Sequence, residues 1–366
     1  MIYLDYNATA PLRDAAFATM SEALRQGGNP SSVHRQGRAA RRLIEEAREI
    51  VAAAVGAVPN GVIFTSGGTE ANNLALSAFP GRRILASAVE HPSILKGKID
   101  AVVPVDRFGL IDLAALDEIL SADKRPALLA LMLANNETGV IQPVAEAAAL
   151  AHRHGALVHG DAIQALGKLP VDLASLGLDS LSLSAHKIGG PQGVGALVLA
   201  DPEADLASLI VGGGQERRHR AGTENVAGIA GFAAAVVDLG DVKAEAARLA
   251  ALRDRIEKIA LEALSGITIF GRKVGRLPNT SCLALPSVPA QTLLMALDLA
   301  GIAVSAGSAC SSGKLGPSPV LLAMGESEKA GAAIRLSLGW ATTESEVESF
   351  IGQFIAISQR LMREAA

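Results

Sequence analysis

The sequence predicts an α/β fold, with a mostly parallel central sheet in a large domain and a smaller α+β domain at the C-terminal end. Short apolar or β-branched runs alternate with helical patterns along the first part of the chain, as in sheets whose strands are joined by helices. The pattern changes after about residue 240, where a long charged helix is expected. Since 366 residues exceed one typical domain, we expect two. The large domain is expected at residues 12–245, and the small domain at residues 246–366 together with residues 1–11.

The large domain is expected to contain an early helix, Arg38–Val55, whose apolar residues recur at helical spacing beside a charged face. The strands that follow are short apolar or β-branched runs. We expect them at Val62–Thr65, Arg83–Ser87, Ala101–Pro104, Ala127–Leu133, Ala156–His159, Ser180–Ser184 and Gly195–Leu199. The helices between these strands are expected at Thr69–Phe79, Asp112–Leu120 and Val144–His154.

The small domain is expected to combine long helices with a few strands. Its helices should span Val242–Leu264, Ala290–Ala300 and Glu344–Arg363, the last of them amphipathic. Its strands are expected at Ile267–Phe270, Thr280–Leu285 and Ala333–Leu338. A Gly/Ser-rich stretch that holds Cys310 precedes the last of these strands.

Composition excludes several classes of protein. Hydrophobic residues make up 49% of the chain and charged residues 19%, so a large core can form and disorder is not expected. The formal net charge of −4 gives no overall attraction to nucleic acid or to an anionic membrane. No apolar run reaches the roughly 18 residues that span a bilayer, and the start, MIYLDYNATAPL, does not resemble a signal peptide. Because two cysteines are too few for a disulfide framework, we expect a cytoplasmic protein with reduced thiols.

A lysine stands where an expected strand meets a glycine-rich turn, in the segment LSLSAHKIGGPQGVG. Partial burial there would lower the pKa of the Lys187 amine and make it a nucleophile that can form a Schiff base. The alternative is an ordinary surface lysine before a loop, which is the commoner setting for this residue type.

A strand is also expected to meet a helix in the segment FTSGGTEANN. Gly67, Gly68 and Thr69 would leave backbone N–H groups open at the helix N-terminus, where an anion can bind. A simple N-cap by Ser66 or Thr69 is an equally good interpretation of this segment alone.

Two more polar residues follow expected strands. Asp161, in HGDAIQALGK, lies where open α/β sheets bind ligands, and a buried carboxylate needs a cationic partner such as a protonated pyridine nitrogen. A solvated N-cap aspartate is the alternative. His91, in AVEHPS, could stack on a cofactor ring or move protons, although a lone histidine at a strand end is more often structural.

The two cysteines stand in different surroundings. Cys310 lies among Ser and Gly residues in VSAGSACSSG, and an exposed thiol there can act as a nucleophile. Cys282 alternates with apolar residues in TSCLAL and is expected to be buried in a strand. Two cysteines at this separation match no zinc spacing. A Cys–His protease arrangement is compatible with the residue count, but it would not explain Lys187.

Taken in this order, the segments resemble class V, fold type I enzymes that depend on pyridoxal 5′-phosphate (PLP), and more closely the cysteine desulfurases of the NifS/IscS type. The resemblance spans nearly the whole chain. It is carried by YLDYNATAPL, FTSGGTEANNLA, AVEHPSIL, ANNETGVIQP, HGDAIQALGK, SLSAHKIGGPQGVGAL, GGGQERRHRAGTENV, SAGSACSSG and IRLSLGWATTESEV. Several such motifs in the order of the family identify it far more specifically than any one motif alone.

The resemblance implies cofactor roles for residues at matching positions. Lys187 resembles the Schiff-base lysine, His91 the histidine that stacks on the pyridine ring and assists proton transfer, and Asp161 the partner of the ring nitrogen. Gln164 resembles the hydrogen-bond donor to the ring hydroxyl. The other cofactor-binding positions by resemblance are Gly68, Thr69, Ser184 and His186 at the phosphate, Asn136, and Thr223, which the second subunit of a homodimer would contribute.

The resemblance also implies the reaction and its partners. Asn7, Asn136 and Arg335 resemble the substrate-side groups, with Arg335 pairing with the carboxylate of L-cysteine. Cys310 resembles the cysteine that takes the sulfur as a persulfide, leaves L-alanine and passes the sulfur to an acceptor such as an iron–sulfur scaffold protein. Nitrogenase assembly, general iron–sulfur assembly and tRNA thiolation all remain open as pathways. No resident metal is expected, and a transient iron–sulfur cluster on Cys310 is the one metal role left open.

Three alternatives belong to other classes. Another class V PLP enzyme, such as an aminotransferase or a selenocysteine lyase, would not need Cys310. A non-catalytic protein of the same fold is disfavoured by the intact set of Lys187, Asp161 and His91. Nucleic-acid binding through the basic residues 217–220 is disfavoured by the net acidity and by the lack of interleaved aromatic residues. We expect binding to neither nucleic acid nor membrane.

Overall fold

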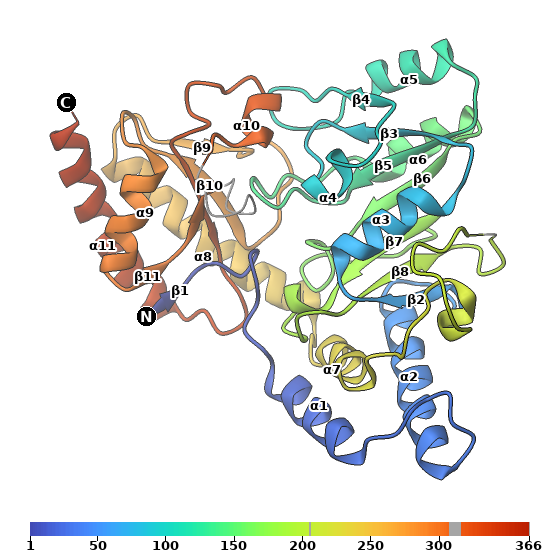
Figure 1. Cartoon of the computed structure of the whole chain (residues 1–366). Coiled ribbons are helices and arrows are strands. Elements are labelled where there is room, and N and C mark those ends of the chain that lie inside the picture. Colours follow the sequence, from blue (N-terminus) through green and yellow to red (C-terminus); the bar gives the residue numbers. More distant parts are fainter. Residues whose placement is uncertain (205, 307–315, 366) are drawn as a thin grey trace.

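The computed structural model describes residues 1–204, 206–306 and 316–365. Cys310 lies outside these described residues. Within them the chain forms two main sheets in separate halves of the molecule, and the helices pack around each sheet (Figure 1).

The larger sheet has seven strands in the order β2-β8-β7-β6-β5-β3-β4. Strand β8 runs antiparallel to its neighbours β2 and β7, and the other neighbouring pairs are parallel. Most of its strand residues are buried on both faces, as is usual when helices cover a parallel sheet. The bounds are β2 (Val62–Thr65), β3 (Arg83–Ser87), β4 (Ala101–Val103), β5 (Ala127–Met132), β6 (Leu157–Asp161), β7 (Ser180–Ser184) and β8 (Gly195–Leu199).

Helices surround the larger sheet, and α1, α2 and α7 lie together at one end of it (Figure 1). Helix α5 begins where the Asp112 carboxylate accepts hydrogen bonds from two N–H groups of its first turn, at 2.9 and 3.0 Å. The bounds are α1 (Asp14–Gln26), α2 (Arg35–Ala54), α3 (Gly68–Ala78), α4 (Pro92–Leu95), α5 (Leu113–Ala122), α6 (Val144–Arg153) and α7 (Val226–Val237). Short 3₁₀ turns lie at Pro59–Gly61, Ala185–Lys187 and Gln215–Arg218.

The smaller sheet is antiparallel and has the order β12-β13-β10-β9. Its last helix, α11, starts with a reciprocal cap in which Thr343 and Glu346 each bond the other's backbone N–H. The bounds are β9 (Thr268–Phe270), β10 (Thr280–Ala284), β12 (Ser305–Ala306), β13 (Ala333–Ser337), α8 (Val242–Ala263), α9 (Ala290–Leu299), α10 (Pro319–Ala323) and α11 (Glu344–Glu364).

The start of the chain packs against the C-terminal part. Strand β1 (Ile2–Tyr3) pairs in parallel with β11 (Ile302–Ala303), and Asp5 forms a bridge with Ser337 of β13. Leu4 belongs to the hydrophobic cluster of the smaller half, which is separate from the main cluster around the seven-stranded sheet. The domain limits expected from the sequence remain a prediction.

The predicted α/β fold with a mostly parallel sheet is confirmed. The expected strands and helices occur with their ends shifted by a few residues at most. The sequence patterns did not predict helices α1 and α7. Helix α7 is apolar on nearly all sides and therefore shows no amphipathic period. No helix in the described part of the chain has the length and apolar character needed to cross a membrane.

Candidate active site

A cavity of about 130 Å³ is lined by almost all of the residues that the resemblance assigned to cofactor and substrate. Thr223 is exposed and does not line this cavity. Its expected contribution to the phosphate site of a second subunit remains a prediction. Cys310 cannot be placed, because it lies outside the described residues. The lining residues are Asn7, Gly68, Thr69, His91, Met132, Ala134, Asn136, Asp161, Ile163, Gln164, Ser184, His186, Lys187 and Arg335.

The sheet positions most of these side chains at one edge. Asp161 ends β6, Ser184 ends β7, and Lys187 closes the 3₁₀ turn that follows β7 directly. His91 follows β3 and Asn136 follows β5. Because parallel strands end at the same edge of a sheet, residues far apart in sequence meet there.

The N-terminus of α3 borders the cavity without a side-chain cap. Its N-cap residue is Gly67, which has no side chain, and the described residues show no side-chain cap at this terminus. The alternative of a side-chain N-cap is therefore wrong, and the open N–H groups suit an anion. A Cβ atom on Gly68 would lie 2.2 Å from Ile163 Cδ1, so a larger residue here would displace the Ile163 side chain, which also lines the cavity.

His186 lies beside this helix terminus as a neutral side chain. Its Nδ1 is 3.1 Å from Thr9 Oγ1. Burial, together with the nearby Lys187 and Lys168 amines, lowers the pKa of the His186 imidazole to about 4. A neutral imidazole can donate or accept one hydrogen bond at each nitrogen, so it can serve as a polar ligand at this end of the cavity.

Asp161 is buried and its carboxylate is oriented by two donors. Asn72 Nδ2 donates to Oδ2 at 2.8 Å, and the Ile163 N–H donates to Oδ1 at 2.9 Å. Burial raises the pKa of the Asp161 carboxyl, whereas these hydrogen bonds and the nearby His91 and Lys187 lower it. A carboxyl that is buried and hydrogen-bonded is not a solvated N-cap, and it is set up to pair with a cationic group in the cavity.

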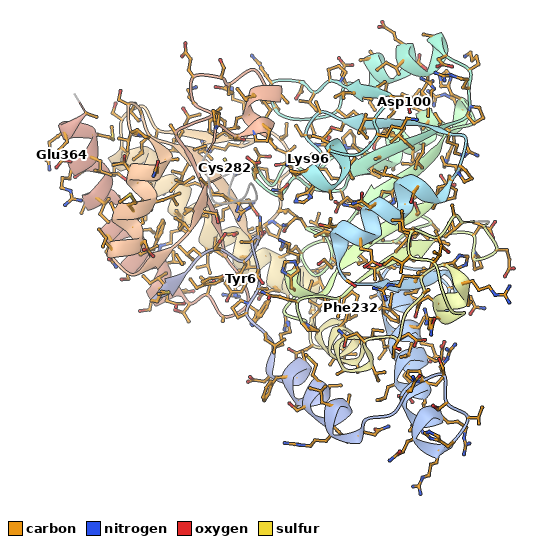
Figure 2. All side chains as sticks on the ribbon, viewed as in Figure 1. Tyr6, Lys96, Asp100, Phe232, Cys282 and Glu364 are labelled. Carbon is orange, nitrogen blue, oxygen red and sulfur yellow. The ribbon has the colours of Figure 1, made fainter. Side chains whose placement is uncertain are left out.

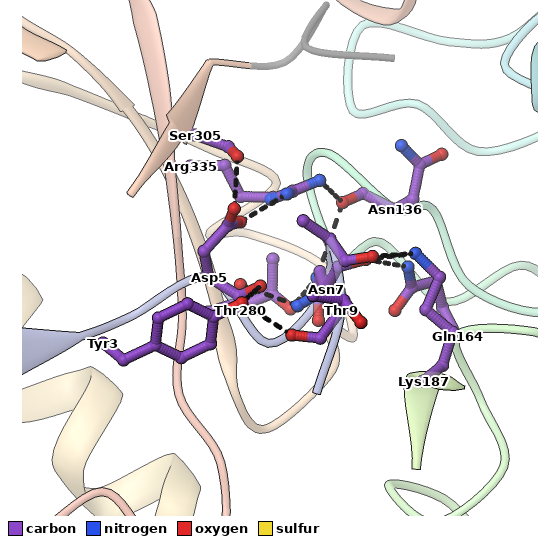
Figure 3. Close-up of polar contacts among 12 residues, drawn as sticks. Tyr3, Asp5, Asn7, Thr9, Asn136, Gln164, Lys187, Thr280, Ser305 and Arg335 are labelled. Carbon is purple, nitrogen blue, oxygen red and sulfur yellow. Dashed lines mark hydrogen bonds and ion pairs between the residues drawn. The ribbon is translucent and has the colours of Figure 1, made fainter. Parts of the chain in front are cut away.

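The Lys187 amine points at the first residues of the chain. Its Nζ donates to the backbone oxygens of Asn7 at 2.6 Å and Ala8 at 2.8 Å (Figure 3). Lys187 is half-buried at the cavity and is not an ordinary surface lysine. Desolvation of an amine favours its neutral, nucleophilic form.

Arg335, from β13, forms part of the opposite wall of the cavity. Its Nη2 lies 2.7 Å from Asp5 Oδ1, and its Nη1 donates to the Asn136 backbone oxygen at 3.0 Å (Figure 3). Asp5 is held in turn by Ser305, whose Oγ donates to Oδ2 at 2.7 Å. Among the described residues, the buried Arg335 Nε has no hydrogen-bond partner, so this guanidinium has donor capacity left for a carboxylate.

Lys168 is a buried site residue that the sequence patterns did not single out. Its Nζ donates to Gln164 Oε1 at 2.7 Å and to Asn7 Oδ1 at 3.2 Å. Burial lowers the pKa of the Lys168 amine well below its usual value, and the charges of Lys187 and Arg335 lower it further. The available signal was its place four residues after Gln164 at the end of HGDAIQALGK, but its partner Asn7 is distant in sequence.

Asn72 and Ser93 are two more residues to which the sequence patterns gave no role. Asn72 Nδ2 donates to Ser93 Oγ at 2.9 Å as well as to Asp161. Ser93 Oγ lies 2.8 Å from His91 Nδ1. These residues therefore connect Asp161 with His91, although neither stands out in the sequence beyond its place in the strings FTSGGTEANN and AVEHPS.

Cys282 lies in β10 and is fully buried, as predicted (Figure 2). Burial raises the pKa of the Cys282 thiol, so the reactive thiolate is disfavoured.

The basic residues 217–220 include two side chains with partners inside the chain. Arg217 donates to Asn60 Oδ1 and to the Val62 backbone oxygen, both at 3.0 Å. Arg220 pairs with Glu70 at 2.9 Å.

The family model described as Aminotransferase class-V matches residues 2–350. The chain is 41% identical over 377 residues to the cysteine desulfurase IscS of Dictyoglomus turgidum, covering 98% of this chain and 95% of that protein. It is 45% identical over 368 residues to a cysteine desulfurase of Cereibacter sphaeroides, covering 96% and 94%. The structure of a NifS-like protein from Rickettsia africae superposes with a TM-score of 0.91 at 36% identity, covering 98% of this chain and 99% of that one.

Proposed function

The chain belongs to the class V aminotransferase family, and we propose that it is a PLP-dependent cysteine desulfurase. In this proposal it converts L-cysteine to L-alanine and transfers the sulfur to an acceptor. The observation that carries the proposal is the single cavity that gathers Lys187, Asp161, His91 and Arg335 beside an uncapped helix N-terminus. The printed names of the relatives point to the same activity.

The donor set of the cavity fits PLP. The open N–H groups of α3, with Thr69, Ser184 and His186 around them, suit a phosphate group. The buried Asp161 carboxylate suits a protonated ring nitrogen, and Gln164 suits the ring hydroxyl. Lys187 would hold the cofactor covalently through Nζ, and His91 would lie against its ring.

When bound, the cofactor supplies a carbonyl group that condenses with amines and a ring that withdraws electrons from the substrate Cα. Lys187 Nζ removes the proton from that Cα. Asp161 keeps the proton on the ring nitrogen and so maintains the withdrawal of electrons. Arg335 binds the carboxylate of cysteine and thereby orients the Cα–H bond toward the lysine.

Cys310 accepts the sulfur in this proposal. Its Sγ, as a thiolate, forms a bond to the substrate sulfur while the substrate Cβ–S bond breaks and leaves its electron pair on the carbon side. Cβ takes up a proton, the proton removed from Cα is returned, and alanine leaves. A protein acceptor, such as an iron–sulfur scaffold, then removes the sulfur from Cys310. The proposal includes a homodimer, in which Thr223 of each subunit reaches the phosphate end of the other cavity. It also places the enzyme in the cytoplasm.

The Cys310→Ala variant tests the proposal, with Cys282→Ala as the matched control. Incubated with PLP, L-cysteine and a thiol reductant, the wild-type protein should release equal amounts of alanine and sulfide. Cys310→Ala should still bind cysteine and change the visible absorbance of the cofactor, but lose at least about 100-fold in turnover. Cys282→Ala should retain turnover and lose about 1 kcal/mol of stability from its small cavity.

Two alternatives have distinct outcomes in the same assay. A selenocysteine lyase would keep full activity on selenocysteine without Cys310, because a selenolate leaves without help from an enzyme thiol. An aminotransferase would produce a keto acid in place of alanine. Full cysteine turnover by Cys310→Ala would contradict the proposed persulfide step.

A further inference from the structure

A chain of polar side chains lies behind the cavity and joins His159, on β6, to His91. His159 Nε2 is 3.2 Å from Asn72 Oδ1, and Asn72 Nδ2 reaches Asp161 Oδ2 at 2.8 Å and Ser93 Oγ at 2.9 Å. Ser93 Oγ is 2.8 Å from His91 Nδ1, and the Ser93 N–H donates to the same nitrogen at 3.1 Å.

The carboxylate of Asp161 determines the direction of the hydrogen bonds. An ionised carboxylate only accepts, so the Asn72 atom that faces it must be the amide nitrogen. Its two hydrogens then go to Asp161 and to Ser93 Oγ, which leaves Asn72 Oδ1 as the acceptor from His159 Nε2.

The state of His159 agrees with this direction. Burial lowers the pKa of its imidazole to about 3, so it is neutral and carries one ring proton. With that proton on Nε2, which lies 3.2 Å from both Asn72 Oδ1 and Ser182 Oγ, Nδ1 can accept from Ser180 Oγ at 2.9 Å. Every member of the chain then has a partner of the correct kind.

The hydrogen bond from Asn72 also determines how the Ser93 hydroxyl contacts His91. Its hydroxyl oxygen already accepts from Asn72, so its hydrogen is available for His91 Nδ1. Two donors of the same residue, the hydroxyl and the backbone N–H, therefore point at one ring nitrogen. The backbone N–H can only donate, so Nδ1 must be unprotonated to accept from it, and the single proton of the neutral ring lies on Nε2.

We propose that Asn72 and Ser93 are positioning residues that hold His91 as a neutral imidazole with its proton on Nε2, so that His91 donates a hydrogen bond into the cavity. The acceptor is the sulfur of the substrate, which rests on the proposed function. Because Nε2 already carries the proton, His91 donates to this sulfur and is not the base that removes the thiol proton, which stays on the outer sulfur of the persulfide.

The charged groups around His91 are compatible with this state. Burial is the main reason that the pKa of the His91 imidazole is lowered; Lys187 acts in the same direction and Asp161 acts against it. Glu90, the preceding residue, is buried, and burial raises the pKa of its carboxyl, which favours the neutral acid. We therefore expect the His91 ring to be neutral at neutral pH.

Nitrogen NMR of the protein labelled with ¹⁵N-histidine measures the tautomer directly, with and without PLP. His91 should show an unprotonated Nδ1 and a protonated Nε2 across neutral pH. Ser93→Ala removes one of the two donors to Nδ1 and should raise the pKa of His91 by about half to one pH unit. Asn72→Ala should move it in the same direction, whereas Ser77→Ala, a matched hydroxyl deletion on α3, should leave it unchanged. A proton on Nδ1 in the wild-type protein would overturn the proposal even if a variant failed to fold.

Kinetics of two isosteric substitutions test the consequence for the substrate. The side-chain amide of glutamine places an N–H near the position of imidazole Nε2, and that of asparagine places one near Nδ1. The kcat/KM of His91→Gln should exceed that of His91→Asn by about 10-fold or more. Equal losses would overturn the assigned donor role. If the wild-type protein showed the predicted tautomer but no turnover of cysteine, the proposed function would fall and the positioning role of Asn72 and Ser93 would stand.

Discussion

The wall of the cavity formed by the seven-stranded sheet and the wall formed by residues 1–9 with the smaller sheet are held by different contacts. On the sheet wall, Asp161 and Ser184 stand at neighbouring strand ends and are positioned by the sheet itself. On the other wall, Arg335 depends on Asp5, which lies 330 residues away in sequence. The groups proposed for the cofactor are thus placed by regular structure, and those proposed for the substrate by side-chain contacts between residues far apart in sequence.

Asn7 connects the two walls. Its backbone oxygen accepts from Lys187 Nζ and from Gln164 Nε2, and its side-chain oxygen accepts from Lys168 Nζ and Asn279 Nδ2. Its own amide donates to Thr280 Oγ1 at 2.8 Å (Figure 3). Movement of the first residues of the chain would therefore disturb hydrogen bonds on both walls of the cavity.

The largest effect is expected on the sheet wall, from Lys187→Ala. The variant should lose the covalent link to PLP and about 100- to 10,000-fold in turnover, since it lacks both the amine that holds the cofactor and the base. Borohydride reduction followed by mass spectrometry should locate the cofactor on Lys187 in the wild-type protein and find none in the variant. The exposed Lys96→Ala is the matched control and should behave like wild type. A covalent link elsewhere would contradict the assignment.

A smaller effect, confined to substrate binding, is expected on the other wall. Arg335→Lys keeps the charge but loses the planar pair of donors, so KM for cysteine should rise about 10- to 100-fold with a smaller fall in kcat. PLP content should stay unchanged. Arg255→Lys on α8, where the arginine pairs with Glu348 at the surface, should leave both parameters as they are. Loss of PLP from Arg335→Lys would show that the two walls are not separable.

The smallest effect is expected from Lys168, whose amine lies between the two walls. It should appear as a pH dependence of the free energy of unfolding. Lys168 has a lowered pKa in the folded state, so between that value and its ordinary value near 10.5 the unfolded chain binds more protons. The unfolding free energy of the wild type should therefore rise with pH in this window, by at most about 1.4 kcal/mol per pH unit relative to Lys168→Met. Urea denaturation at several pH values checks this, with the exposed Lys243→Met as control. Parallel pH dependences for wild type and Lys168→Met would mean that Lys168 is charged when buried.

The sequence by itself was sufficient for the fold class and for selecting candidate residues of the sheet wall, whose roles were given by the family resemblance. Strand ends, glycine turns and helix starts are local features, because they depend on neighbours within a few residues. Lys187, Asp161, His91 and the Gly68–Thr69 turn could therefore be selected before their positions in space were known. Helix α7 could not be recognised from such local features, because burial on nearly all sides removes the amphipathic pattern that marks a surface helix.

Only the tertiary structure decided the supporting contacts. The hydrogen bonds of Asn7 to Lys168 and Thr280, and of Asn72 to Asp161 and Ser93, join residues that no local pattern relates. The direction of these bonds depends on which atoms face each other in a buried space, where each polar group needs a partner. That requirement, and not residue type alone, determines which nitrogen of His91 carries the proton.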